Sequence, residues 1–249
     1  MPVPWQHAII VGASSGIGAE LTRQLADGGC RTALVARRAP ELERLVHEIA
    51  ARGGAEARAY VHDVTHTDQV PTLFQTICRE LGGLDLIVFA AGIMPRLTAD
   101  EYDFAKDRAT IEVNVLGAVA WLNQAAMRFA RAGVGTIVGI SSVAGDRGRR
   151  GYPVYNASKA ALTTYLEALR NRLAPCGVHV VTIKPGPVAT PMTDGLANTP
   201  FLIPAERAAR EILVAARRGR ATAYTPALWR PIMGVIRALP SAIMRRLPL

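Results

Sequence analysis

Short apolar runs alternate with longer segments of helical periodicity along most of the chain. The apolar runs predict strands at residues 7–11, 32–36, 57–62, 84–91, 135–140 and 178–184. The segments between and after them predict helices at 17–26, 40–52, 68–81, 109–132, 153–175 and 205–218. Apolar strands separated by helices are typical of a parallel sheet with helices on both faces. We therefore predict one α/β unit, a Rossmann-like doubly wound parallel sheet.

The pattern changes after Gly186. Residues 187–205 carry several prolines and little periodicity, so they predict an irregular loop. The loop is apolar at Val188, Met192, Leu196, Phe201 and Leu202. These side chains could contact a hydrophobic ligand, or they could simply pack the loop against the body of the protein.

Residues 224–249 predict a basic amphipathic extension that follows the main unit at 1–223. The apolar residues that recur there at helical spacing are Ile232, Ile236, Leu239, Ile243 and Leu247. Pro240-Ser241 predicts the start of a second short helix. Such helices suit three roles: peripheral contact with a membrane surface, a cover over the substrate pocket, or contact with a partner subunit.

The charge of the chain is concentrated at its C-terminal end. The net charge is +9, and a strongly basic protein often binds a polyanion. Residues 1–200 hold 20 basic and 18 acidic residues, whereas residues 201–249 hold nine and two. The main unit is thus nearly neutral. Aromatic clusters do not accompany the basic residues, so we predict no nucleic-acid binding.

Cysteine and histidine spacing indicates neither a disulfide framework nor a metal site. The three cysteines are far apart and form no C-x-x-C pair. His62 and His66 are four residues apart, but no third ligand accompanies them. The first residues do not have the pattern of a signal peptide, and no apolar run is long enough to span a membrane. We predict a cytoplasmic protein without a metal.

A glycine-rich turn follows the first predicted strand, in the order Gly12-Ala-Ser-Ser-Gly16-Ile-Gly18. Glycines at such a turn let the backbone approach a pyrophosphate closely. The helix that follows offers free N–H groups and the positive end of its dipole. The turn therefore favours dinucleotide binding, although its spacing differs from the commoner G-x-G-x-x-G pattern.

Tyr155 and Lys159 are four residues apart on a predicted helix, so they share one face. A neighbouring ammonium favours the phenolate and should lower the pKa of Tyr155. The helix follows a predicted strand that ends at Ser141-Ser142. This position favours Tyr155 as a general acid or base over a pair on a solvated face.

Taken together and in order, these residues resemble the short-chain dehydrogenase/reductases from about His7 to Thr190. The matching parts are the glycine turn, Asp63-Val64, Ala91-Gly92, Asn114, a serine before the catalytic helix, the Tyr155/Lys159 pair and Pro185-Gly186.

The resemblance implies a catalytic set of Asn114, Ser142, Tyr155 and Lys159. Tyr155 would exchange a proton with the carbonyl or hydroxyl oxygen, which Ser142 would polarise. Ser142 is preferred to Ser141 because its offset of thirteen residues from Tyr155 is the usual one in the family. Lys159 would lower the pKa of Tyr155 and hold the nicotinamide ribose, and Asn114 would hold a water that relays protons to Lys159.

The resemblance also implies a nicotinamide cofactor. Asp63 would hydrogen-bond adenine, and Val64 would flank it. The other implied contacts are Gly12, Ser14, Ser15, Gly16, Ile17, Gly18, Ala91, Gly92, Tyr155, Lys159, Pro185, Gly186, Val188 and Thr190.

The cofactor is predicted to be NADP(H). Members that use NAD have an acidic residue at the end of the second strand, and here that position is Ala36. Arg37 and Arg38 follow, and arginine matches a phosphate by charge and by its planar donors. We expect Arg37 to be the main ligand of the 2′-phosphate, with Ser14 or Arg38 assisting.

The chain departs from the family at two apolar places. Val11 stands where threonine is usual, and Ala90-Ala91 replaces Asn-Ala before Gly92. In the family these polar groups support each other, so we expect a packed contact to replace a polar one here. A glycine-rich segment that often closes the seventh strand is also missing.

The resemblance also implies that residues 187–205 form the substrate loop. The sequence thus predicts an NADPH-dependent oxidoreductase that interconverts a small-molecule carbonyl, a hydrophobic ketone or aldehyde, and its alcohol. A homodimer or homotetramer is expected by resemblance. The alternative is a non-catalytic, NADP(H)-sensing regulatory protein on the same fold. An intact set of catalytic residues argues against a sensor, because a sensor needs no proton relay.

Overall fold

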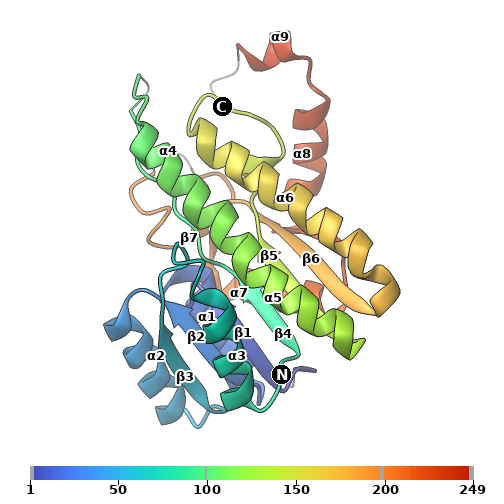
Figure 1. Cartoon of the computed structure of the whole chain (residues 1–249). Helices are drawn as coiled ribbons and strands as arrows, with labels where there is room; N and C mark the ends of the chain where they lie inside the picture. The colour runs from blue at the N-terminus through green and yellow to red at the C-terminus, as the bar shows by residue number, and fades with distance from the viewer. Residues whose placement is uncertain (1–2, 99, 197–198, 247–249) are drawn as a thin grey trace.

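A computed structural model describes residues 3–98, 100–196 and 199–246 of the chain (Figure 1). Its main strands are β1 His7–Val11, β2 Arg31–Ala36, β3 Ala57–Val61, β4 Leu86–Phe89, β5 Gly135–Ile140, β6 Val178–Pro185 and β9 Thr222–Thr225. Its helices are α1 Gly16–Asp27, α2 Ala39–Ala51, α3 Val70–Leu81, α4 Phe104–Ile111, α5 Gly117–Ala132, α6 Pro153–Leu173, α7 Ala205–Arg217, α8 Trp229–Ala238 and α9 Ser241–Met244. The predicted doubly wound α/β fold is confirmed.

The seven strands form one parallel sheet in the order β3-β2-β1-β4-β5-β6-β9. The chain order reverses between β1 and β4. In open sheets of this kind, ligands bind outside the carboxyl ends of the strands at such a reversal. The topology therefore predicts a ligand site beside the loops that follow β1 and β4.

Each strand contributes side chains to both faces of the sheet. In β1, Ile9 and Val11 join a core with residues of α3, α5 and α6, while Ala8 and Ile10 join a core with residues of α1, α2 and α7. This alternation follows from the two-residue repeat of a strand. It explains why the strands read as continuous apolar runs in the sequence.

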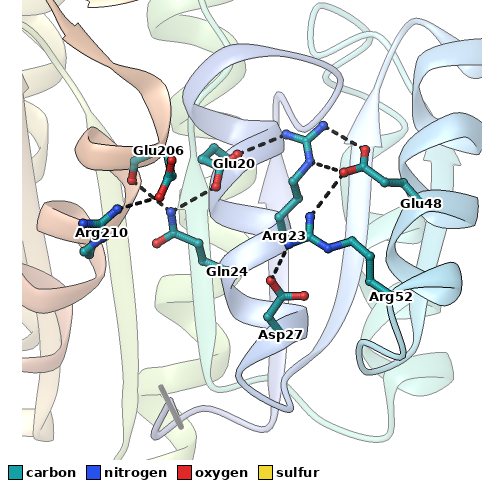
Figure 2. Close-up of polar contacts among 8 residues, drawn as sticks. All are labelled: Glu20, Arg23, Gln24, Asp27, Glu48, Arg52, Glu206 and Arg210. Carbon is teal, nitrogen blue, oxygen red and sulfur yellow. Dashed lines mark hydrogen bonds and ion pairs between the residues drawn. The ribbon is translucent and has the colours of Figure 1, made fainter.

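Polar side chains join α1, α2 and α7, the three helices that cover one face of the sheet (Figure 2). Arg23 of α1 pairs with Glu48 of α2 at 2.8 Å between Nε and Oε1. Gln24 of α1 donates a 2.9 Å hydrogen bond to the carbonyl oxygen of Glu206 in α7. These contacts hold α1, whose first turn borders the site, against both of its neighbours.

The predicted helix at 109–132 is longer and less regular in the structure. It begins with α4, passes through a π-helical turn at Glu112–Leu116 and continues as α5. The Asp103 carboxylate accepts hydrogen bonds from the backbone of Ala105 and Lys106, so it caps α4. The π turn carries Asn114, and such turns are frequent at functional sites.

The C-terminal residues form β9, α8 and α9. Strand β9 crosses the predicted boundary at 223/224, and it supplies the seventh strand without a glycine-rich segment. The helices α8 and α9, red in Figure 1, lie together at one end of the molecule. Their predicted apolar stripe ends at Leu247, which lies outside the described residues.

The buried side of α8 faces the protein. Trp229 and Met233 are buried in a cluster with Val143, and Ile232 and Ile236 pack against it. Among the described residues, no helix combines the length and the apolar character needed to cross a membrane.

Candidate active site

One cavity runs along the carboxyl ends of the strands, where the topology predicts a ligand. Every residue predicted for the site lines this cavity except Asp63 and Asn114. The cavity extends from Arg37 and Arg38, after β2, to Ser142 after β5 and Tyr155 on α6. Residues from distant parts of the sequence are thus brought into one site.

The glycine turn forms one wall of the cavity. Gly12 has a φ of 94° and Gly16 a φ of 54°, in the left-handed region that favours glycine. A side chain at Gly12 would collide with the backbone of Ala91, and one at Gly18 with the carbonyl of Gly12. The turn therefore leaves its backbone and the start of α1 open to the cavity, which fits a dinucleotide pyrophosphate.

Both arginines after β2 lie beside this turn. Nη2 of Arg38 donates 2.8 Å hydrogen bonds to the hydroxyls of Ser14 and Ser15. Arg37 is 61% exposed in its side chain, and its Nη1 lies 3.4 Å from Oδ2 of Asp63. The contacts with the turn thus come from Arg38, while Arg37 stays accessible to a ligand.

Asp63 is engaged by its own neighbours. Its Oδ1 accepts hydrogen bonds from the backbone and hydroxyl of Thr65, at 3.0 and 2.8 Å. Burial raises the pKa of Asp63, but these hydrogen bonds and Arg37 outweigh it, so the net pKa is lowered. Val64 lines the cavity and also packs against Gly117, where an added Cβ would lie 3.0 Å from it.

Asn114 lies under the cavity and is fully buried. Its Oδ1 accepts a 2.8 Å hydrogen bond from the backbone of Ile93, and its Nδ2 donates 3.0 Å bonds to the Ile93 carbonyl and the Ser158 hydroxyl. A Cβ at Gly92 would lie 3.3 Å from Oδ1 of Asn114 and 3.4 Å from Nζ of Lys159. Asn114 thus fixes the turn after β4 close to the lysine.

The two serines after β5 have different surroundings. The Ser141 hydroxyl is occupied by the Lys159 carbonyl at 2.9 Å and the Thr163 hydroxyl at 2.8 Å. The Ser142 hydroxyl accepts from the backbone of Ala144 at 3.0 Å and donates to the Pro185 carbonyl at 3.5 Å. Burial raises the pKa of the Tyr155 phenol, and an interaction with the Ser142 hydroxyl opposes this rise.

Burial dominates the titration of the Tyr155/Lys159 pair. It raises the pKa of Tyr155, against the opposing effects of Ser142 and Arg149, and it lowers the pKa of Lys159 to about 8. The net shift of Tyr155 is thus upward, and the predicted lowering by Lys159 stays a prediction. The ammonium lies over the phenol ring, 5.7 Å from its centroid, and donates to the Ile140 carbonyl at 3.0 Å.

A small recess lies on another side of Tyr155. Its lining is Pro95, Leu97, Lys106, Asp107, Thr110, Tyr152 and Tyr155. Within the predicted substrate loop, Met192 lines the main cavity, Val188 is buried and Phe201 and Leu202 are exposed. The loop thus both packs against the body and borders the site.

Sequence reasoning missed His62 and Tyr152. His62 lines the cavity, and its Nδ1 is buried with no hydrogen-bond partner among the described residues. Its signal was a polar side chain at the last position of the predicted strand 57–62. Tyr152 gave no signal, because its place in the recess depends on a loop conformation with a φ of 57°. Among the described residues, no group of three potential metal ligands comes together.

Known proteins match this fold and sequence. A family model described as short chain dehydrogenase matches residues 6–200. The chain therefore belongs to the short-chain dehydrogenase family, whose members are oxidoreductases.

Relatives and solved structures agree with this assignment. An uncharacterized oxidoreductase of Myxococcus xanthus is 38% identical over 76% of this chain and 74% of its own. An uncharacterized oxidoreductase of Mycobacterium tuberculosis is 32% identical over 97% of this chain and 96% of its own. A short-chain dehydrogenase from Sphingobium yanoikuyae, solved in complex with NADPH, has a TM-score of 0.82 at 23% identity and covers 97% of this chain and 98% of that one.

Proposed function

We propose that the protein is an NADP(H)-dependent carbonyl reductase that converts a ketone or aldehyde to an alcohol, or the reverse. The observation that carries this proposal is a single cavity with arginines at one end and Ser142, Tyr155 and Lys159 at the other. A bound nicotinamide cofactor would supply or accept the hydride.

The chain's own residues would handle the proton and the charge on the oxygen. The raised pKa keeps the Tyr155 phenol protonated at neutral pH, so it donates a proton to the carbonyl oxygen during reduction. The Ser142 hydroxyl has one proton, so it would leave the 3.5 Å contact with the Pro185 carbonyl and donate its hydrogen bond to the same oxygen. Lys159, held by the Ile140 carbonyl, would bind the cofactor ribose. The amide protons of Asn114 are used by Ile93 and Ser158, so the relay water would donate to the remaining lone pair of its Oδ1.

The preference for NADP(H) rests on Arg37 and Arg38. Both line the cavity, and neither faces an acidic residue at the end of β2, because that position is Ala36. Arg38, beside Ser14, and the exposed Arg37 would share the 2′-phosphate. Arg37 would leave Asp63 to do so, which frees that carboxylate toward adenine.

The substrate is proposed to be hydrophobic on the side that faces Leu97 and Met192. Leu97 and Pro95 line the recess beside Tyr155, and Met192 lines the main cavity on which Tyr155 also borders. The extension favours a role at the pocket over a role at a membrane, because Trp229 and Met233 of α8 are buried against Val143, although Val235 and Ile243 stay exposed. Assembly as a homodimer or homotetramer and a cytoplasmic location stay predictions.

Single-turnover oxidation of NADPH with a panel of ketones and aldehydes tests the proposal. We expect turnover with at least one carbonyl, and Tyr155→Phe should slow it by about 10²- to 10⁴-fold while NADPH still binds. Tyr165→Phe is the matched control, because Tyr165 is on the same helix and its hydroxyl donates to Asn123 at 2.8 Å, away from the cavity. We expect its turnover to equal that of the wild type.

The same experiment discriminates the non-catalytic alternative. A protein that only senses NADP(H) would bind NADPH but oxidise it with no carbonyl. Carbonyl-dependent turnover that survives Tyr155→Phe would instead contradict the proposed mechanism.

A further inference from the structure

A buried ionic network lies directly behind the reactive end of the cavity. The ammonium of Lys184 pairs with Oδ1 of Asp146, and their side chains are 7% and 2% exposed. The Tyr224 hydroxyl donates a 2.7 Å hydrogen bond to Oδ2 of the same carboxylate. Lys184 also lies over the Tyr224 ring, 5.7 Å from its centroid. We name these three residues the Asp146 network.

The network joins three segments that border the reactive atoms. Asp146 follows Ser142 by four residues, after a short 3₁₀ turn at Val143–Gly145. Lys184 directly precedes Pro185-Gly186, and the Pro185 carbonyl accepts from the Ser142 hydroxyl. Tyr224 belongs to β9, which leads into the extension.

Stability alone does not account for such a network. Removing a carboxylate and an ammonium from water is costly, and an apolar pair of similar volume often replaces a buried ion pair without loss of stability. What the ion pair adds is direction, because each oxygen of Asp146 is fixed by a different donor. The loop that carries Ser142 is thereby held in one place.

The extension holds the same loop at two further points. Arg147 donates hydrogen bonds to the Leu239 carbonyl at 3.1 Å and to the Ser241 hydroxyl at 3.3 Å. Val143, directly after Ser142, is buried in the cluster with Trp229. The residues on both sides of Asp146 are therefore anchored to α8 and the start of α9.

We propose that the Asp146 network, together with the extension, positions Ser142 for catalysis. Asp146, Lys184 and Tyr224 are positioning residues in this scheme, since they act through Ser142 and do not line the cavity. The inference rests on the proposed function, because it needs Ser142 to contact the substrate oxygen. It assigns the extension to the active site of its own chain.

Tyr224→Phe tests the network with a small change. It removes the hydroxyl that fixes Asp146 and keeps the ring that packs beside Lys184. We expect kcat to fall by about tenfold to a hundredfold, as for other misplaced catalytic groups, while the Kd for NADPH stays the same.

Tyr60→Phe is the matched control for this change. The Tyr60 hydroxyl donates a 2.6 Å hydrogen bond to the Glu80 carboxylate, and burial raises its pKa to about 12, as it does for Tyr224. Tyr60 lies on β3, outside the cavity lining. We expect Tyr60→Phe to keep the wild-type kcat.

The Ser142→Ala background separates positioning from general damage. If Tyr224 acts through Ser142, Tyr224→Phe lowers kcat in the wild type but not further in Ser142→Ala. An equal fall in both backgrounds, or no fall in the wild type, would overturn the inference. The failure of the proposed function looks different: Tyr155→Phe and Ser142→Ala would then both retain wild-type turnover, or no carbonyl would be reduced.

Discussion

The ammonium of Lys159 lies 5.7 Å from the ring centroid of Tyr155, one helical turn away on α6. Burial acts on the two groups in opposite directions, because it disfavours the charged form of each. The pKa of Tyr155 is raised, and that of Lys159 is lowered to about 8. The phenol therefore keeps its proton at neutral pH, while the lysine loses its charge just above it.

The lowered pKa of Lys159 predicts a pH-dependent stability. Its pKa is about 8 in the fold against a usual 10.5, so the unfolded chain binds more protons between these values. The unfavourable contribution of Lys159 is complete below pH 8 and disappears as pH rises toward 10.5. Lys159→Met removes this contribution, so its stability relative to the wild type should be greater at pH 7 than at pH 10. The expected difference in free energy of unfolding is up to about 3 kcal/mol. Urea denaturation without cofactor at the two pH values measures this difference.

Lys106→Met is the control for that measurement. Lys106 is on α4, and the hydrogen bond to Glu101 raises its pKa above 10.5. Its effect on stability should therefore be the same at pH 7 and pH 10. If the effect of Lys159→Met is equally flat, Lys159 titrates as it does in water and the burial argument fails.

The two arginines after β2 predict a selective effect on NADPH. A hydrogen bond to a charged group contributes about 1.5–3 kcal/mol, so Arg37→Ala and Arg38→Ala should each raise the Kd for NADPH by about 10- to 100-fold. The Kd for NADH should change little, because NADH lacks the 2′-phosphate. Fluorescence titration of both cofactors measures the two constants.

Arg44→Ala controls for the loss of a positive charge near this site. Arg44 is an exposed residue of α2, and it does not line the cavity. Its removal should leave both Kd values unchanged. Similar affinities of the wild-type protein for NADH and NADPH would contradict the preference itself.

Most of the fold could be predicted from the sequence because the central strands of the sheet are buried on both faces. Strands β1 and β5 lie at the predicted residues. Strand β9 was missed because it is a short edge strand with an exposed first residue, Thr222, and no apolar run. The part of α4 before residue 109 was missed because it has little apolar periodicity, although Asp103 gives a capping signal.

The site, like the fold, could be predicted from the sequence only in part. Positions that depend on local chain order, such as Gly12 and Tyr155, reach the cavity as expected. The pKa of Tyr155 could not be predicted, because it depends on burial by segments far apart in sequence. The ion pair between Asp146 and Lys184 could not be predicted for the same reason, since the two residues are 38 positions apart.

The apolar contact between the turns after β1 and β4 predicts the effect of Val11→Thr. Val11 is fully buried in a cluster against which Ala91 packs, and its carbonyl accepts a 2.8 Å hydrogen bond from the backbone of Ala90. A threonine hydroxyl placed there without a partner costs about 1–3 kcal/mol. We expect a lower Tm, partly restored by adding Ala90→Asn. A Tm above that of the wild type for Val11→Thr alone would show that no packed contact had replaced the polar one.

The close approach of Gly186 to Trp229 predicts a pair of compensating changes. A side chain at Gly186 would collide with the Trp229 indole, and the atom it would meet first is Nε1. That nitrogen is buried and has no hydrogen-bond partner among the described residues, so Trp229→Phe removes it without breaking a hydrogen bond. Gly186→Ala alone should lower stability by about 1–3 kcal/mol, as overpacking does, and weaken NADPH binding.

Combining Trp229→Phe with Gly186→Ala should then recover part of both losses, because the shorter ring leaves room for the added methyl group. Thermal melts and NADPH titrations of the two single variants and the double variant measure the coupling. Gly148→Ala serves as the control, since nothing lies within 4 Å of an added Cβ there. Losses that simply add in the double variant would mean that the tryptophan of the extension does not set the space available at Gly186.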